Sequence, residues 1–293
     1  EYINFRREAY RTAGLYQENA SGIVPDIDSD KDIFKASGDP TAWANIEKGW
    51  VNGTWNGNLV STTDWGDMVK RTGITQEHNL QAMGGTEKVQ SFFSFGYLDQ
   101  DGTNKVQDYE RYTAKLGVDI QATPWFKYGG SMNGTWSKQN YGYAGSGSRA
   151  ANGIYAAALG MYPFAQPYDE DGNWIYLPGA YTNVVNPVEE HSKVTDERKT
   201  LRLLGSFYGE VDFGQMIKPL EGLKFRINFG PDFREYRQGI YRLGSSILQG
   251  TGKEDDKPYA KATKSQNLSY TLDKLVYYDK KIGLHNVGAT LLH

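Results

Sequence analysis

The stretches YTAKLGVDIQ at residues 112–121 and FKYGGSMNGTWS at residues 126–137 decide the fold of this chain. In each of them, apolar or small residues alternate with polar residues or glycine. This period of two is typical of a β-strand whose two faces meet different surroundings. The larger residues of the apolar set are Tyr112, Ala114, Leu116, Val118, Ile120, Phe126, Tyr128, Met132 and Trp136. A short turn at residues 123–124 joins the two strands.

Further strands flank this pair on both sides. Residues 78–83 and 89–97 surround the turn-forming sequence GGTEK at 84–88, which predicts a β-hairpin. Alternation returns after residue 199, at residues 201–213, 223–241, 268–273 and 285–292. We therefore expect an all-β fold with about eight antiparallel strands within residues 76–293.

The composition excludes several classes of function. The formal net charge is −3 without a run of Lys and Arg, so nucleic acid is not expected as a partner. The absence of cysteine excludes disulfides and thiolate metal sites, and the four histidines are scattered along the chain. We expect neither a metal nor a cofactor.

The connections between the strands alternate in length. Short turns at 84–88, 123–124, 215–222 and 278–283 alternate with longer segments near 98–109, 140–199 and 245–262. Such alternation is typical of outer-membrane β-barrels, which have short periplasmic turns and long extracellular loops. A mean hydropathy of −0.63 is compatible with this, because half of each membrane-spanning strand faces a wet interior.

A barrel wall predicts which environment each residue faces. We expect one alternating set to contact lipid and the other to face the barrel interior. The lipid-facing set includes Leu116, Val118, Phe126 and Met132, and the interior set includes Lys115, Asp119, Lys127 and Asn133.

Residues 1–75 precede the strands. Apolar residues at spacings of three and four predict a short amphipathic helix over residues 2–15, and Thr63 or Asp64 can cap a second one. Residues 26–30 resemble the start of a calcium loop, but Lys31 replaces the required glycine, so we expect a solvated acidic loop. Because 84–88 is a short turn, we expect residues 1–75 to form an extracellular loop segment that touches 140–199.

The order of several short motifs resembles the SusC/RagA type of TonB-dependent outer-membrane transporter. The resemblance is specific over residues 63–138 and looser at 167–173 and 186–187. The motifs are Thr63-Asp64-Trp65, Arg71-Thr72-Gly73, His78-Asn79-Leu80, Gly84-Gly85-Thr86-Glu87-Lys88, Gly96-Tyr97-Leu98, Gly102 and Asp108-Tyr109-Glu110-Arg111-Tyr112.

The resemblance implies a large plugged barrel of roughly 22 strands. It further implies import of glycans (oligosaccharides) or peptides across the outer membrane, with a SusD-like surface lipoprotein as partner, outer-membrane lipid around the wall and energy from the TonB complex. The signal peptide, TonB-interacting segment, plug, first strand and second half of such a barrel have no counterpart in these residues. We therefore expect a fragment of the barrel.

Two other classes of protein remain open. A carbohydrate-active soluble β-protein could use Glu189-Glu190 or Asp169-Glu170-Asp171 as acid and base, but adjacent carboxylates in a Gly/Asn-rich loop favour a solvated turn. We therefore expect no catalytic residues and no enzyme. A passive porin or adhesin would share the barrel but lack the ordered motifs.

Aromatic residues in the longest loop are candidates for substrate binding. They could stack on a ligand, or they could pack the loop against itself. The candidates are Tyr141, Tyr143, Trp174, Tyr176 and Tyr181.

Overall fold

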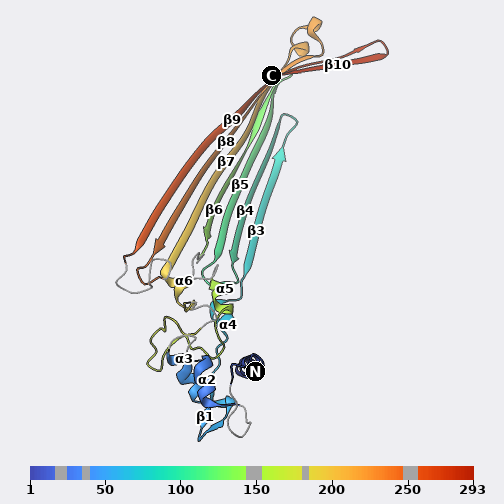
Figure 1. The fold of residues 1–293 in the computed structure, drawn as a ribbon. Coiled ribbons are helices and arrows are strands. Elements are labelled where there is room, and N and C mark those ends of the chain that lie inside the picture. The colour runs from blue at the N-terminus through green and yellow to red at the C-terminus, as the bar shows by residue number, and fades with distance from the viewer. Residues whose placement is uncertain (17–24, 35–39, 143–153, 180–184, 247–256) are drawn as a thin grey trace.

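The computed structural model describes residues 1–16, 25–34, 40–142, 154–179, 185–246 and 257–293. It holds one eight-stranded antiparallel sheet, in which each strand pairs with its neighbours in the sequence (Figure 1). The strands are β3 (Thr75–Gly85), β4 (Val89–Asp101), β5 (Asp108–Thr123), β6 (Phe126–Asn140), β7 (Val194–Asp212), β8 (Leu223–Arg242), β9 (Tyr259–Ile282) and β10 (His285–Leu292). The predicted all-β sheet is confirmed.

Several strands extend further than the alternation predicts. β4 and β5 continue to the pair Asp101 and Asp108, and β9 begins at Tyr259, so the loops near 98–109 and 245–262 are shorter than expected. The hydrogen-bonded ladder continues there although both faces of the strands carry polar residues. Alternation marks only the part of a strand whose two faces differ, and it therefore does not mark the strand ends.

The two faces of the sheet carry different side chains. On the outward face, Leu116 pairs with Met132, and these side chains are 58% and 46% exposed. On the inner face, the Tyr208 hydroxyl donates a 2.5 Å hydrogen bond to Asp119. The register gives each residue the face that the alternation predicts, with the apolar set unburied because lipid is its solvent.

Aromatic side chains border the apolar band of the outward face. Tyr97, Tyr112 and Trp136 lie side by side on β4, β5 and β6, with ring centroids 4.9 and 5.6 Å apart. Phe126 and Tyr128 lie towards the other end of β6, with ring centroids 5.5 Å apart. Trp136 and Phe126 are separated by about 34 Å along the strand, or about 26 Å for a strand tilted by ~40°, which matches the height of the apolar band of a barrel.

A helical cap, formed by described residues 1–69 and 154–193, lies at the end of the sheet opposite the short turns (Figure 1). Its elements are α1 (Tyr2–Thr12), α2 (Ile27–Phe34), α3 (Pro40–Glu47), β1 (Trp50–Val51), β2 (Thr54–Trp55), η2 (Gly57–Leu59), α4 (Trp65–Val69), α5 (Ile154–Leu159) and α6 (Glu190–Lys193). The short 3-10 helices η3 (Phe213–Gln215) and η4 (Lys218–Leu220) lie at the other end. Within the described residues, no helix is long and apolar enough to cross a membrane.

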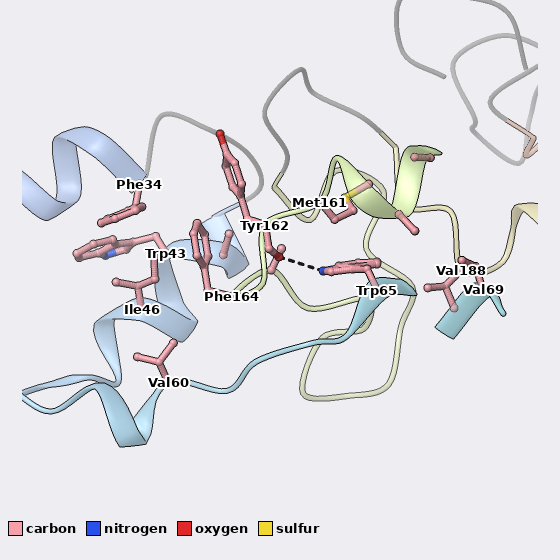
Figure 2. Packing of buried hydrophobic residues seen from close by; sticks show 14 of the residues in the cluster. Phe34, Trp43, Ile46, Val60, Trp65, Val69, Met161, Tyr162, Phe164 and Val188 are labelled. Atoms are coloured by element: carbon pink, nitrogen blue, oxygen red, sulfur yellow. Dashed lines mark hydrogen bonds between the residues drawn. The ribbon is translucent and has the colours of Figure 1, made fainter. Parts of the chain in front are cut away.

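The two long segments of the chain pack against each other in the cap (Figure 2). Phe34 packs edge-on against Phe164, with ring centroids 5.4 Å apart. The Trp65 indole donates a 3.0 Å hydrogen bond to the Tyr162 carbonyl. Asp64 caps α4 by accepting a hydrogen bond from the backbone of Asp67, as its position in the sequence predicts. The predicted contact between residues 1–75 and 140–199 is therefore present.

The prediction of a solvated acidic loop at residues 26–30 was wrong. Residues 27–30 form the first turn of α2, and the Asp30 carboxylate is fully buried. Arg7 of α1 donates to Asp30 from Nε at 2.8 Å and lies 4.0 Å from the ring centroid of Trp55. Burial, together with the nearby Asp30 carboxylate, raises the pKa of Tyr16 to about 12. The partner of Asp30 is 23 residues away, so local composition does not reveal it.

The first prediction concerns the two faces of β5. Val118→Arg should lower the free energy of unfolding by about 2 to 4 kcal/mol, because it places a charge near the middle of the apolar band. Asp119→Arg should cost about 1 kcal/mol, since it removes mainly the hydrogen bond from Tyr208. Urea unfolding of the full-length protein in lipid vesicles measures both values, and equal losses would contradict the assignment of the faces.

The second prediction concerns the buried ion pair of the cap. Asp30→Ala leaves the buried Arg7 guanidinium without its carboxylate, and should destabilise the cap by about 3 to 5 kcal/mol. Hydrogen exchange should accelerate in α1 and α2 but not in the sheet. Glu8→Ala, which removes the exposed pair with Arg11, is the matched control and should leave exchange unchanged. Unchanged exchange in Asp30→Ala would show that the pair does not hold the cap.

Candidate ligand site at the rim of the sheet

A row of polar and aromatic side chains crosses the inner face of the sheet beside the cap. Gln100 of β4 pairs with Tyr109 of β5, Tyr109 pairs with Gln139 of β6, and Gln139 pairs with Arg198 of β7. The register continues from Arg198 to Gln238 of β8. Alternation places all of these residues on the face that carries Asp119, so the row lines the inside of the wall.

Part of this row borders a hollow, here called the mouth pocket, with a volume of about 360 Å³. Its lining consists of Gln100, Gly102, Gln107, Asp108, Tyr109, Gln139, Asn140 and Tyr141. Asn140 donates to both carboxylate oxygens of Asp108, at 2.7 and 2.8 Å. Gln107 donates to the Tyr141 carbonyl at 3.1 Å. The wall of the pocket is therefore held by its own hydrogen bonds.

The loop between β4 and β5 is fastened to the cap side of the sheet. The Arg71 guanidinium donates to the carbonyls of Gly102 and Gln107, at 3.1 and 2.8 Å. Gly73 is required because a Cβ there would lie 2.6 Å from the Asp101 carbonyl oxygen. Val106 has a φ of 64°, a strained conformation for a β-branched residue that these contacts hold in place.

Of the three predicted substrate-binding aromatics that belong to the described residues, Tyr141 is the one that lines the mouth pocket. Its side chain is 39% exposed, and the Arg198 guanidinium lies 3.7 Å from the ring centroid. Asp196 forms a 2.9 Å ion pair with Arg198 and also accepts a hydrogen bond from Gln238. Arg198 is paired, and the Asp108 carboxylate of the lining accepts two hydrogen bonds from Asn140, so amides and aromatic rings make up the rest of the polar lining. Such groups suit a neutral, polar ligand.

Two further predicted aromatics, Trp174 and Tyr176, lie in the cap and not in the mouth pocket. Trp174 and Tyr176 contact each other in the cap, with ring centroids 5.9 Å apart, and the Lys193 ammonium stands 3.6 Å from the Trp174 centroid. The Trp174 indole nitrogen and the Tyr176 hydroxyl are buried and find no hydrogen-bond partner in the part of the chain that is described. Tyr143 and Tyr181 lie outside the described residues. A role of these four aromatics in binding stays a prediction.

The two acidic segments differ from each other. Asp169 closes a turn, and hydrogen bonds from the side chain and backbone of Asn173 lower its pKa. This segment is the solvated turn that the sequence predicts, and its Glu170 pairs with Lys48 at 2.9 Å. Glu190, in contrast, is fully buried and accepts a 3.0 Å hydrogen bond from Ser246, so the prediction of a solvated turn was wrong there. Among the described residues, no group of three metal-binding side chains comes together.

Sequence reasoning missed Gln100, Tyr109 and Gln139 as site residues. Gln100 and Gln139 lie beyond the predicted ends of their strands, and Tyr109 lies before the predicted start of its strand. Extending the alternation of β4, β5 and β6 to the rim would have placed all three on the inner face. Their presence in one pocket depends on the register between the strands, which the sequence does not state.

Comparison with known proteins gives a consistent result. No protein-family model matches the chain. TonB-dependent receptor P3 of Formosa agariphila is 24% identical over 272 residues, which cover 92% of this chain and 26% of that protein. TonB-dependent receptor SusC of Bacteroides thetaiotaomicron is 24% identical over 264 residues, covering 82% of this chain and 25% of that protein. The chain thus spans about a quarter of the length of these relatives.

Solved structures share the fold. The structure of the RagAB peptide transporter superposes with a TM-score of 0.67 at 16% sequence identity, covering 99% of this chain and 31% of that chain. The RagAB peptide importer in its open-open state gives the same TM-score at 17% identity. The sheet and cap therefore have the fold of part of such a barrel. The resemblance to SusC/RagA-type TonB-dependent transporters is confirmed, and so is the outer-membrane location that it implies.

Proposed function

We propose that the chain supplies part of the wall and of the extracellular cap of a TonB-dependent importer in the outer membrane. The observation that carries this proposal is the sheet with two different faces. Its outward face bears an apolar band between aromatic borders, while its inner face is polar and ends in the mouth pocket. A wall of this kind separates lipid from a transport path, and the relatives that share its sequence are TonB-dependent receptors.

The substrate we propose is an oligosaccharide or a peptide. Three amide side chains, at Gln100, Gln107 and Gln139, can donate and accept hydrogen bonds, and Tyr109 and Tyr141 offer aromatic surface. Sugar hydroxyls and peptide backbones present the matching neutral polar groups. The exposed part of the cap is the proposed contact surface for a SusD-like lipoprotein. The likeness to a RagAB structure supports an assembly of that kind.

The proposed import can be tested in cells that carry the full-length protein. Labelled oligosaccharides and labelled peptides are supplied separately, with TonB present or deleted. We expect one of the two classes to accumulate inside the cells when TonB is present. Accumulation should fall to the level of cells without the transporter when TonB is deleted. Uptake that persists without TonB would instead identify a passive porin.

The mouth pocket gives this experiment an internal check. Replacing Gln100 and Gln139 by alanine removes two inner-face amides, and should lower uptake at limiting substrate by about thirtyfold if each contributes roughly 1 kcal/mol. Replacing Gln81 and Gln90 by alanine removes two inner-face amides nearer the opposite rim and is the matched control. Equal effects of both double substitutions would exclude the mouth pocket as a binding site.

The proposed orientation is open to a labelling experiment, because this chain contains no cysteine and any cysteine outside it can be replaced. Leu159 in α5 is 66% exposed, and Thr86 lies in the exposed turn between β3 and β4. In the full-length protein on intact cells, a membrane-impermeant thiol reagent should modify Leu159→Cys but not Thr86→Cys. Modification of Thr86→Cys alone would invert the topology and place the cap in the periplasm.

A further inference from the structure

The outward face carries a row of cations that the proposed import does not use. Lys138 of β6 pairs with Lys199 of β7, Lys199 pairs with Arg237 of β8, and Arg237 pairs with Lys264 of β9. These four residues, the cation row, share a face with Trp136 and point away from the mouth pocket. Four adjacent strands thus present a positive charge at the same register position.

Nearby carboxylates balance the cation row only in part. Glu197 is shared by Lys138, at 3.1 Å, and Lys199, at 2.6 Å. Glu235 is shared in the same way by Arg237 and Lys264. At the edge of the row, both Asp108 and Glu110 act on Lys138, so the charge of that lysine is balanced. The excess lies on β7 to β9, where Lys199, Arg237 and Lys264 share the two carboxylates of Glu197 and Glu235. Like charges directly opposite each other destabilise a sheet, so the excess of cations calls for an anion outside the chain.

The exposure of the cation row leaves room for such an anion. The side chains of Lys199, Arg237 and Lys264 are 41%, 60% and 53% exposed although each contacts a carboxylate. A guanidinium can bind a phosphate through two parallel hydrogen bonds, and nearby lysines add positive charge. The chemistry of the row therefore favours a phosphate group.

The height of the cation row identifies the source of that phosphate. Lys138 is two residues beyond Trp136, and Lys264 is four residues beyond Leu268, which is 69% exposed. These steps put the row about 7 to 14 Å along the strands from the apolar band, in the layer that lipid headgroups occupy. A lipid can bind the cations with its headgroup and the band with its acyl chains, whereas free phosphate gains only the first contact.

We propose that the cation row binds a phosphate-bearing lipid of the outer leaflet. This inference rests on the proposed orientation, in which the cap and this rim of the sheet lie outside. The lipid headgroup would span β7 to β9 and neutralise the excess charge. Its chains would lie on exposed apolar residues of β9 such as Leu268 and Tyr270.

The test measures the lipid retained by the full-length protein. The purified transporter is incubated with a phosphorylated lipid A, or with the same lipid after removal of its phosphates, and bound lipid is counted by native mass spectrometry. The triple variant combines Lys199→Gln, Arg237→Gln and Lys264→Gln. It should retain at least about tenfold less of the phosphorylated lipid than the wild type. The dephosphorylated lipid should bind wild type and variant equally.

Two further variants make the result specific. The first variant removes three cations of the inner face, by Lys115→Gln, Lys127→Gln and Lys224→Gln. It should retain as much lipid as the wild type. Lys199→Arg with Lys264→Arg keeps the charges and should also retain it. A variant whose barrel has not folded migrates more slowly on unheated gels. If the triple variant does not fold, single substitutions such as Lys264→Gln replace it, and the expected loss of lipid retention is then smaller.

Several results would overturn the proposal. These are unchanged retention in the cation-row variant, an equal loss in the inner-face variant, or a loss that does not depend on the phosphates of the lipid. Complete displacement by millimolar inorganic phosphate would identify a site for a free anion instead. Lipid retention and substrate import are measured separately. A failure of the lipid proposal leaves import by the wild type unchanged, so it can be distinguished from a failure of the proposed import function.

Discussion

A backbone amide inside hydrocarbon must find its hydrogen-bond partner within the protein, and the architecture of this chain depends on that constraint. Strands satisfy it only when each is paired on both sides, which favours a continuous ladder of neighbours in chain order. Once the ladder is formed, the two faces are free to differ. Lipid covers the outward face, so Leu116 and Leu268 remain exposed without a protein core to cover them. The buried hydrophobic cluster lies in the cap, with Val194 at the start of β7 as its link to the sheet.

The same constraint explains how much could be predicted from the sequence. The alternation at 112–121 and 126–137 gave the face of each residue, because a period of two is a local property. Burial in the cap is not local. Asp30 and Glu190 are polar residues in polar surroundings along the sequence, yet each becomes fully buried beside a partner from a distant segment, Arg7 and Ser246 respectively. The mouth pocket and the cation row depend on register, which emerges only when several strands are aligned.

The cap and the wall are connected through the strand ends. Arg71 follows α4 and donates to the loop between β4 and β5, and the Lys105 backbone donates to the Val69 carbonyl at 3.0 Å. On the other side, Ser246, beyond β8, reaches Glu190 of α6. The cap is thus fastened at two separate places along the rim. The cap therefore helps to fix the positions of the residues that line the mouth pocket, and the structures of pocket and cap are coupled.

Alternation also allows one rim to serve two purposes at once. In β6, Lys138 points outward into the cation row and the next residue, Gln139, points inward into the mouth pocket. In β7, Lys199 likewise points outward and its neighbour Arg198 points inward. A slip of one residue in the pairing would turn the charges of the cation row to the inner face and the amides of the mouth pocket to the outward face. The contacts between the tilted rings of Tyr97, Tyr112 and Trp136 oppose such a slip, because each ring packs on its cross-strand neighbour in the observed register. The aromatic border therefore does more than mark the edge of the membrane: it fixes which side of the wall each functional residue faces.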